Sequence, residues 1–214
     1  MKKGFLVLGL SLTLGFSSFS YAAKEIKISQ LITSAEENQK IYESVKSELS
    51  SFLEIVPVNM EKEHGFNNRS EFAKAVPATI YRMVGVDPYG KVVPTNNYNV
   101  VVAVNGEYRA VITVSLENGK YELQSIGGAP LAKELQATES VNPIATGQER
   151  VMLNVYKYSA TFVTNLNANT AIENADLIPL ESAKMGLNNQ EAGRSAKPVY
   201  KLSEAFDALI ANTY

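Results

Sequence analysis

The stretch VNGEYRAVITVSLENGKYELQSIGG, from Val104 to Gly128, decides the fold of this chain. It holds two Asn-Gly pairs, Asn105-Gly106 and Asn118-Gly119, each flanked by runs in which apolar and polar side chains alternate. Asn-Gly between alternating runs is a strong signal of a two-residue hairpin turn, because both positions of that turn require positive φ. The stretch therefore predicts three antiparallel strands joined by two tight turns.

Two-residue turns fix the pairing within both hairpins. Val104 then pairs with Glu107 and Val102 with Arg109, while Glu117 pairs with Lys120 across the second turn. Because side chains alternate between the two faces of a sheet, this register gathers one apolar set that must cover a core. The set is Val101, Ala103, Tyr108, Ala110, Ile112, Val114, Leu116, Tyr121 and Leu123.

The opposite face of this meander mixes valines with charged and polar side chains. It holds Tyr98, Val100, Val102, Val104, Glu107, Arg109, Val111, Thr113, Glu122 and Gln124. Valines beside charges predict partial cover, by the C-terminal segment, a second subunit or a ligand. A three-residue loop with a glycine bulge also suits Asn-Gly, and it would shift the pairing by one and exchange the faces of a strand.

An amphipathic helix is expected ahead of the meander. Ser34 and Glu37 have capping-box spacing, apolar residues recur behind them at steps of three and four, and Pro57 follows. This pattern predicts a helix over residues 34–54 laid on a sheet. The β-branched run from Thr79 to Val86 predicts a strand, and Lys91–Asn97, with its proline and asparagines, predicts a loop.

The remaining chain alternates short strands with short helices. The segment GGAPLAKELQA predicts a tight turn into a helix, and SEAFDALIA predicts a second helix. The run RVMLNVYKYSATFVTNL predicts one bent strand or a pair of strands, and LIPL and PVYKL predict one strand each. Together these patterns predict an α+β fold. We expect an antiparallel sheet of about five to seven strands, with a long N-terminal helix packed on one face and C-terminal elements on the other.

The first residues have the order of a secretory signal peptide. Lys2 and Lys3 precede the apolar run GFLVLGLSLTLGF, and small and polar residues follow it up to Ala22. The run is too short to cross ~30 Å of hydrocarbon. We therefore expect residues 1–22 to be the signal peptide, residues 23–214 to form a single domain, and the mature protein to be periplasmic or secreted.

Composition narrows the function classes. Removal of Lys2 and Lys3 with the signal peptide leaves 18 of the 20 basic residues against 22 acidic ones, and no basic stripe is visible, so no nucleic-acid partner is expected. No later stretch is long and apolar enough to predict a membrane span after signal cleavage. The chain has no cysteine, which excludes thiol nucleophiles, thiolate zinc sites and disulfides.

Motifs with assigned chemistry are missing from the sequence. His64 is the one histidine, at a predicted helix end, and the chain has no GxSxG, HExxH or Walker-type loop. We expect no cofactor and no metal. Glu107 and Glu122 share the mixed face, and a carboxylate pair of this kind carries the alternative hypothesis of a hydrolase.

Four residues are candidates for ligand binding: Arg82, Tyr98, Arg109 and Gln124. Arg82 interrupts an apolar strand, and Arg109 stands among the valines of the mixed face. A guanidinium in such a place can donate two parallel hydrogen bonds to a carboxylate or a phosphate. The competing interpretation is an aliphatic stem packed on valines with its charged head in water.

The chain holds a series of motifs, which are HGF, a short helix carrying EF, the strand IYRM, the double Asn-Gly meander, SIGGAPLAKEL and, near the end, IPL. In the order of these motifs, the chain resembles a class of exported bacterial proteins of unknown function. The expected architecture is also similar to the cystatin-like and nuclear-transport-factor-2-like ones. Cystatin-type inhibitors carry a QxVxG hairpin, and VAVNGE lacks its glutamine and spacing.

The leading hypothesis is an exported, non-enzymatic binding or interaction protein of the bacterial cell envelope, whose partner is a small molecule, a peptide or a protein. A protease-propeptide-like or inhibitor-like protein is the first alternative. The hydrolase with a carboxylate pair is the second.

Overall fold

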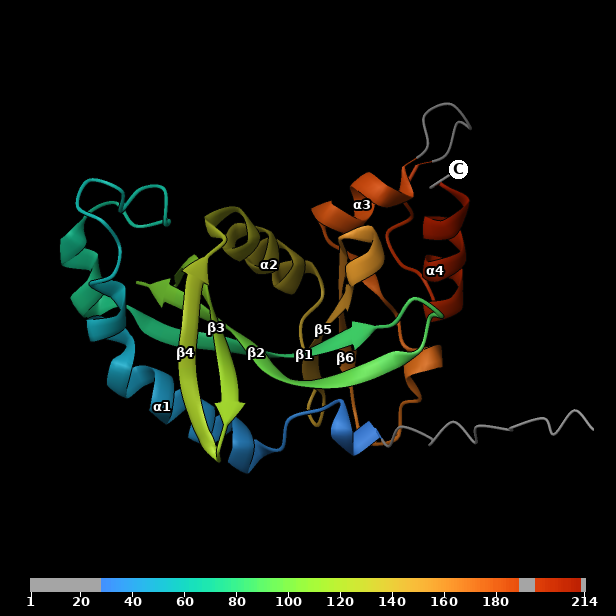
Figure 1. The fold of residues 1–214 in the computed structure, drawn as a ribbon, viewed down its shortest axis with the longest axis horizontal. Coiled ribbons are helices and arrows are strands. Elements are labelled where there is room, and N and C mark those ends of the chain that lie inside the picture. The colour runs from blue at the N-terminus through green and yellow to red at the C-terminus, as the bar shows by residue number, and fades with distance from the viewer. Residues whose placement is uncertain (1–27, 189–194, 213–214) are drawn as a thin grey trace, which may run out of the picture.

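A seven-stranded sheet in the order β4-β3-β2-β1-β5-β6-β7 forms the centre of the molecule (Figure 1). The computed structural model describes residues 28–188 and 195–212, so the expected signal peptide lies outside the described residues. The strands are β1 (Val76–Val86), β2 (Val92–Val104), β3 (Glu107–Glu117), β4 (Lys120–Gly127), β5 (Glu149–Val155), β6 (Ala160–Leu166) and β7 (Ile178–Pro179). Neighbouring strands are antiparallel except β1 and β5, which are parallel. The α+β class is confirmed, with a mostly antiparallel sheet.

Helix α1 (Ala35–Leu53) packs on one face of the sheet, against β1 and β4. It begins at the predicted cap, where the side chain of Ser34 accepts a hydrogen bond from the backbone N–H of Glu37. Its buried stripe, Ile41, Val45, Leu49 and Leu53, joins the β2 valines in one core cluster. The 19-residue helix thus matches the predicted span of residues 34–54 to within one residue at each end.

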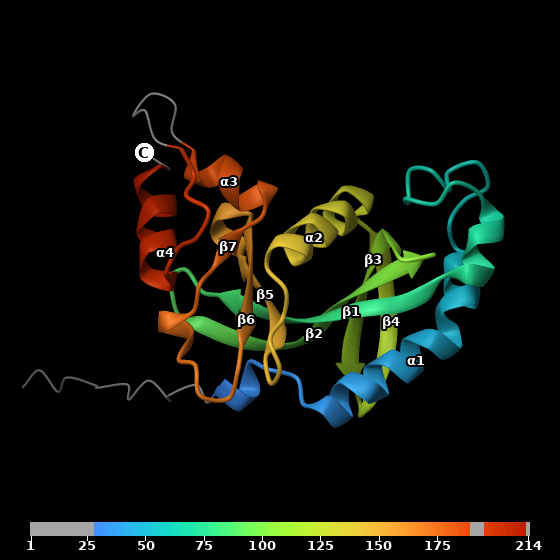
Figure 2. The same cartoon turned by 180° about the vertical axis from the view of Figure 1, so that it is seen from behind.

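Helix α2 (Ala129–Val141) covers the other face of the same strands, and Figures 1 and 2 show α1 and α2 on opposite sides of them. Its Ala132 and Leu135 are buried against Tyr81, Val101 and Val111. Gly128, at φ 71°, makes the predicted tight turn from β4 into this helix. The cover over Val111 is therefore a helix of the same chain.

A β-bulge at Arg109 corrects the predicted register. Val104 pairs with Glu107 as expected, but Val102 pairs with Ala110, so Arg109 is the extra residue. The three β2 valines at 100, 102 and 104 consequently lie under α1 with Ala110, whereas Val101 and Tyr108 lie on the α2 face. The predicted faces of β2 were wrong because a turn sets the register only up to the next bulge.

The second hairpin shows the same behaviour. Glu117 pairs with Lys120 and Val114 with Leu123, as predicted, and Gln124 is then the extra residue before Thr113 pairs with Ser125. Both hairpin turns have the expected positive φ at Asn105 and Asn118. Arg109 and Gln124, the two binding candidates in this meander, are thus both bulge residues.

Several predictions along the rest of the chain are refined. Residues 92–97, expected in a loop, belong to β2, because β1 supplies a partner for Val92, Val93 and Pro94. The run RVMLNVYKYSATFVTNL forms the pair β5 and β6. PVYKL contributes only a bridge from Tyr200 to Leu177.

Helices α3 (Glu181–Leu187) and α4 (Leu202–Ala211) pack with β5 and β6 around a third core cluster, which includes Leu153, Phe162 and Leu209. Short 3₁₀ helices span Ile28–Gln30, Arg69–Lys74, Tyr156–Tyr158 and Ile172–Asn174. None of the helices in the described part of the chain has the length and apolarity that a membrane crossing needs.

Candidate functional site

A cavity of about 480 Å³ opens where the first turns of α1, the start of β1, the end of α2 and the start of β5 meet. Its size is within the usual range of small-molecule sites. Helix α1 turns Ala35, Asn38, Gln39 and Tyr42 toward it, a stripe at steps of three and four that is separate from the stripe packed on the core. The β1 wall contains Ala78, Thr79 and Ile80, where pairing with β2 is irregular.

Glu139 of α2 forms the centre of a dense polar network beside this cavity. Its carboxylate accepts hydrogen bonds from the Tyr81 hydroxyl at 2.5 Å and the Tyr108 hydroxyl at 2.7 Å. Thr79 donates to the same group at 3.2 Å, and the Arg150 Nε lies 3.7 Å from it. Burial, together with the hydrogen bond to Glu139, raises the pKa of Tyr81 far above its usual value, so this hydroxyl stays a donor.

Arg150 is itself fully engaged. Only 7% of its side chain is exposed, and it donates to Asn165 Oδ1 at 3.2 Å while its guanidinium lies over the Tyr81 ring. Tyr81, Tyr108 and Thr79 thus donate hydrogen bonds to Glu139, and Arg150 lies beside it as its counter-charge. The network fixes this wall of the cavity and holds a balanced pair of charges.

Glu149, at the first position of β5, is the second carboxyl group that lines the cavity. Asn38 Nδ2 donates a hydrogen bond to it at 2.6 Å. Among the described residues, no lysine or arginine forms an ion pair with it. Burial raises the pKa of Glu149, the Asn38 hydrogen bond lowers it, and the nearby Glu37 carboxylate raises it further. The cavity thus contains two carboxyl groups in unlike surroundings.

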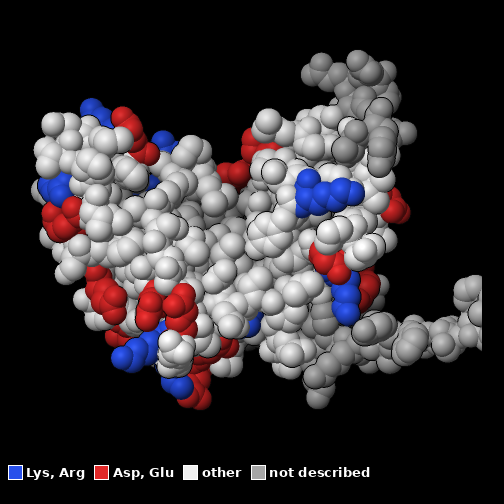
Figure 3. All heavy atoms as spheres, in the orientation of Figure 1, with Lys and Arg blue, Asp and Glu red and all other residues white. Residues whose placement is uncertain are grey.

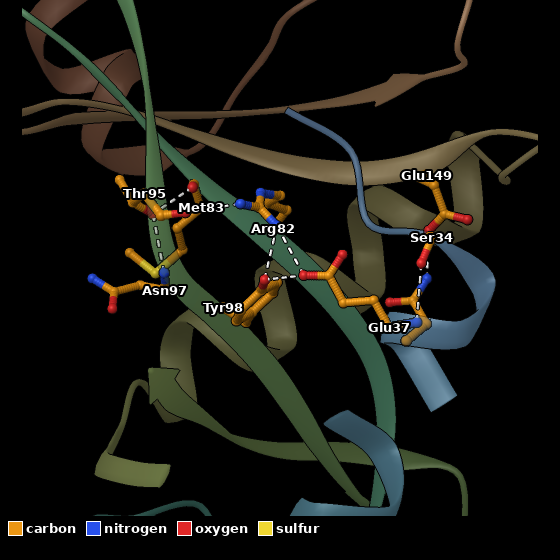
Figure 4. Close-up of polar contacts among 9 residues, drawn as sticks. Ser34, Glu37, Arg82, Met83, Thr95, Asn97, Tyr98 and Glu149 are labelled. Carbon is orange, nitrogen blue, oxygen red and sulfur yellow. Dashed lines mark hydrogen bonds and ion pairs between the residues drawn. The ribbon is translucent and has the colours of Figure 1, made fainter. Parts of the chain in front are cut away.

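Arg82 and Tyr98, two of the predicted binding residues, meet at Glu37 of α1 (Figure 4). Arg82 Nη1 donates to Glu37 at 3.1 Å and to the Tyr98 hydroxyl at 2.7 Å, and its Nη2 donates to the Thr95 carbonyl at 3.0 Å. The Tyr98 hydroxyl donates to Glu37 in turn, and its ring is fully buried. Burial raises the pKa of Tyr98 strongly. This cluster ties the start of α1 to β1 and β2.

Arg109 and Gln124 have partners elsewhere on the sheet. Arg109 lies 2.9 Å from the Glu107 carboxylate and 3.4 Å from Glu71, and Gln124 donates to the Ser115 hydroxyl at 2.7 Å. The structure brings Arg82 and Tyr98 together, and none of the four candidates lines the cavity. Their contact with a ligand stays a prediction.

The cavity residues Glu139, Glu149 and Arg150 were missed by sequence reasoning. The adjacent Glu149-Arg150 pair at the start of an apolar strand is the signal that was available, since β5 is otherwise an alternating apolar run. The sequence predicted Glu107 and Glu122 as the acidic pair, whereas the cavity contains Glu139 and Glu149. Glu107 instead forms an ion pair with Arg109 at the hairpin tip and does not line the cavity.

On the face in Figure 3, acidic groups gather at the lower left, in the region of α1 and β4, with basic groups beside them, and the charged groups elsewhere lie farther apart. Within the described residues, no group of three or more histidine, aspartate or glutamate side chains is placed to hold a metal ion. Comparison with models of known protein families, with curated proteins and with solved structures gave no match.

Proposed function

We propose that this protein is an exported, non-enzymatic binding protein of the bacterial cell envelope, and that it takes a small ligand in the cavity between α1, α2, β1 and β5. One observation carries the proposal. Glu149 is a partly buried carboxyl group at a preformed cavity, hydrogen-bonded by Asn38 and without a cationic partner among the described residues. A buried charge without a counter-charge is costly, and such groups concentrate at functional sites.

Binding fits the surroundings of Glu149 better than activation of a nucleophile. Tyr81, Tyr108, Thr79 and Arg150 all direct their polar groups to Glu139, so they fix the wall of the cavity. Half-buried apolar groups, including Tyr42 and Ile80, complete a mixed lining. A concave site in which placed polar groups stand beside apolar ones can hold and orient a small molecule.

The test is a thermal-shift and calorimetric screen of the purified mature protein against small amines, acids, polyols and short peptides. We expect ligands whose binding is abolished by Ala78→Trp, which fills the cavity, and retained by Ala137→Trp, which adds the same ring on the exposed side of α2. Ligands that bind both variants equally, or no ligand at all, would refute the site. N-terminal sequencing of the protein from a periplasmic extract tests export, with Ala23 expected as the first residue.

A hydrolase is the second candidate, because Glu139 and Glu149 line one cavity in unlike environments. Two carboxyl groups in unlike environments serve as acid and base in glycoside hydrolysis. This candidate predicts turnover of a chromogenic glycoside that falls at least ~100-fold in both Glu139→Gln and Glu149→Gln. Absence of turnover across a panel of glycosides, in a preparation that binds ligands, excludes it.

A further inference from the structure

We propose that the ligand of this cavity carries an organic cation, a primary ammonium or guanidinium group, which pairs with the Glu149 carboxylate. The proposal rests on the proposed function, since it names the chemical class that the same cavity takes. It follows from the negative charge of Glu149, which the surrounding described residues leave without a cationic partner.

The other charged groups around the cavity are already paired. Glu139 has Arg150 and two tyrosine hydroxyls, and Glu37 has Arg82 and the Tyr98 hydroxyl. Glu149 remains, with Asn38 as its hydrogen-bond donor among the described residues. The lining therefore presents one uncompensated negative charge.

A cation offsets the cost of this charge better than other ligand groups do. A carboxylate in partly desolvated surroundings gains most from a charge-assisted hydrogen bond. An anionic ligand would face repulsion from Glu149, and Arg150 has its guanidinium committed to Glu139 and Asn165. A neutral hydroxyl would make a hydrogen bond and leave the charge in place.

The rest of the lining favours a hydrocarbon or aromatic body attached to the cation. Ile80 and the half-buried Tyr42 ring stand on facing elements, and Ile144, 44% exposed, lies at the edge just after α2. Apolar side chains beside one carboxylate without a counter-charge suit an amphiphilic amine.

Three probes with one ring and different head groups test the inference: 2-phenylethylamine, 2-phenylethanol and phenylacetate. Titrations followed by NMR on the mature protein at neutral pH should give an affinity for the amine at least ~10-fold above that for the alcohol, with phenylacetate weakest. Higher salt should narrow the difference between amine and alcohol, because part of it is an ion pair.

Glu149→Gln keeps the shape and the Asn38 hydrogen bond while removing the charge. It should bring the amine to within about threefold of the alcohol. Glu107→Gln, at an exposed hairpin tip, should leave the preference unchanged. Ala78→Trp should abolish binding of the amine.

The outcomes separate this inference from the proposed function. If the alcohol or phenylacetate binds as well as the amine, or if Glu149→Gln keeps the preference, the cationic class is wrong while the cavity stands as a binding site. If none of the three probes binds, the inference is overturned. The proposed function falls only if the wider screen also finds no ligand that Ala78→Trp displaces.

Discussion

At the scale of single residues, ionisation of Glu149 carries a cost. Burial raises its pKa and Glu37 adds to the shift, while the Asn38 hydrogen bond offsets part of it. A carboxyl group whose pKa is higher in the folded than in the unfolded state contributes stability at low pH, and this contribution is lost as pH rises through the folded pKa. The ionised side chain therefore destabilises the unliganded protein at neutral pH.

This argument predicts that Glu149→Gln raises the midpoint temperature of unfolding at pH 7. The gain should shrink as pH is lowered through the raised pKa of Glu149, where the wild-type carboxyl is neutral as well. Differential scanning calorimetry over a pH series measures it, with Glu107→Gln as the exposed control. A midpoint that drops equally at every pH would contradict the assignment.

Arg82 holds a second set of charges at the start of α1. Replacing it by methionine leaves Glu37 and the Tyr98 hydroxyl without their cation, and should cost about 2–3 kcal/mol of unfolding free energy. Because Glu37 is a quarter exposed, this figure lies below the roughly 3–5 kcal/mol that breaking a fully buried ion pair costs. Urea unfolding of Arg82→Met, Glu37→Gln and the double variant measures the coupling. Additive losses would show that the pair does not interact.

At the scale of elements, the β3 bulge lies against a glycine far away in the sequence. A Cβ placed on Gly65 would lie 1.9 Å from the carbonyl oxygen of Arg109, and Gly65 has φ 93°. The loop before the Arg69–Lys74 helix thus lies directly against the bulged backbone. The bulge puts Ala110 on the same face as the three β2 valines, under α1, while Tyr108 lies on the opposite face, where it reaches Glu139.

Gly65→Ala should therefore be strongly destabilising, by more than ~3 kcal/mol, because it combines a backbone clash with an unfavourable φ. Gly106→Ala is the matched control, since Gly106 has φ 82° with nothing within 4 Å of its added Cβ, and should lose only ~1 kcal/mol. Chemical denaturation of both variants gives the comparison. Similar losses would show that the contact with Arg109 is unimportant.

At the scale of the whole molecule, β1 joins the three core clusters. Val84 of β1 belongs to the core cluster that includes residues of β5 and β6, and Tyr81 belongs to the cluster that α2 covers. Ile80 packs against the cluster that lies under α1. The parallel β1–β5 pair thereby connects the meander with the C-terminal elements. The cavity lies at this junction, with lining residues from both parts.

A shared strand predicts that the described domain unfolds as one cooperative unit. Leu49→Ala in the α1 cluster and Phe162→Leu in the β6 cluster should each shift one common transition, the former by about 2–5 kcal/mol. Far-ultraviolet and near-ultraviolet circular dichroism should give coincident curves. Two separate transitions, each moved by one variant, would show independent halves.

The sequence alone determined the α+β class, the cap and span of α1, both Asn-Gly turns and the turn into α2. These features depend on local propensity, turn chemistry and periodicity, which neighbouring residues carry. The cavity residues could not be predicted from local patterns, because Asn38 and Glu149 are 111 residues apart in the sequence. The cost of burying the Glu149 charge also arises only when the chain folds around that side chain. The bulge at Arg109 likewise belongs to the folded chain, in which β3 pairs with β2 and the Arg109 carbonyl lies against Gly65, and it puts Ala110 opposite Val102, where the turn alone predicts Arg109.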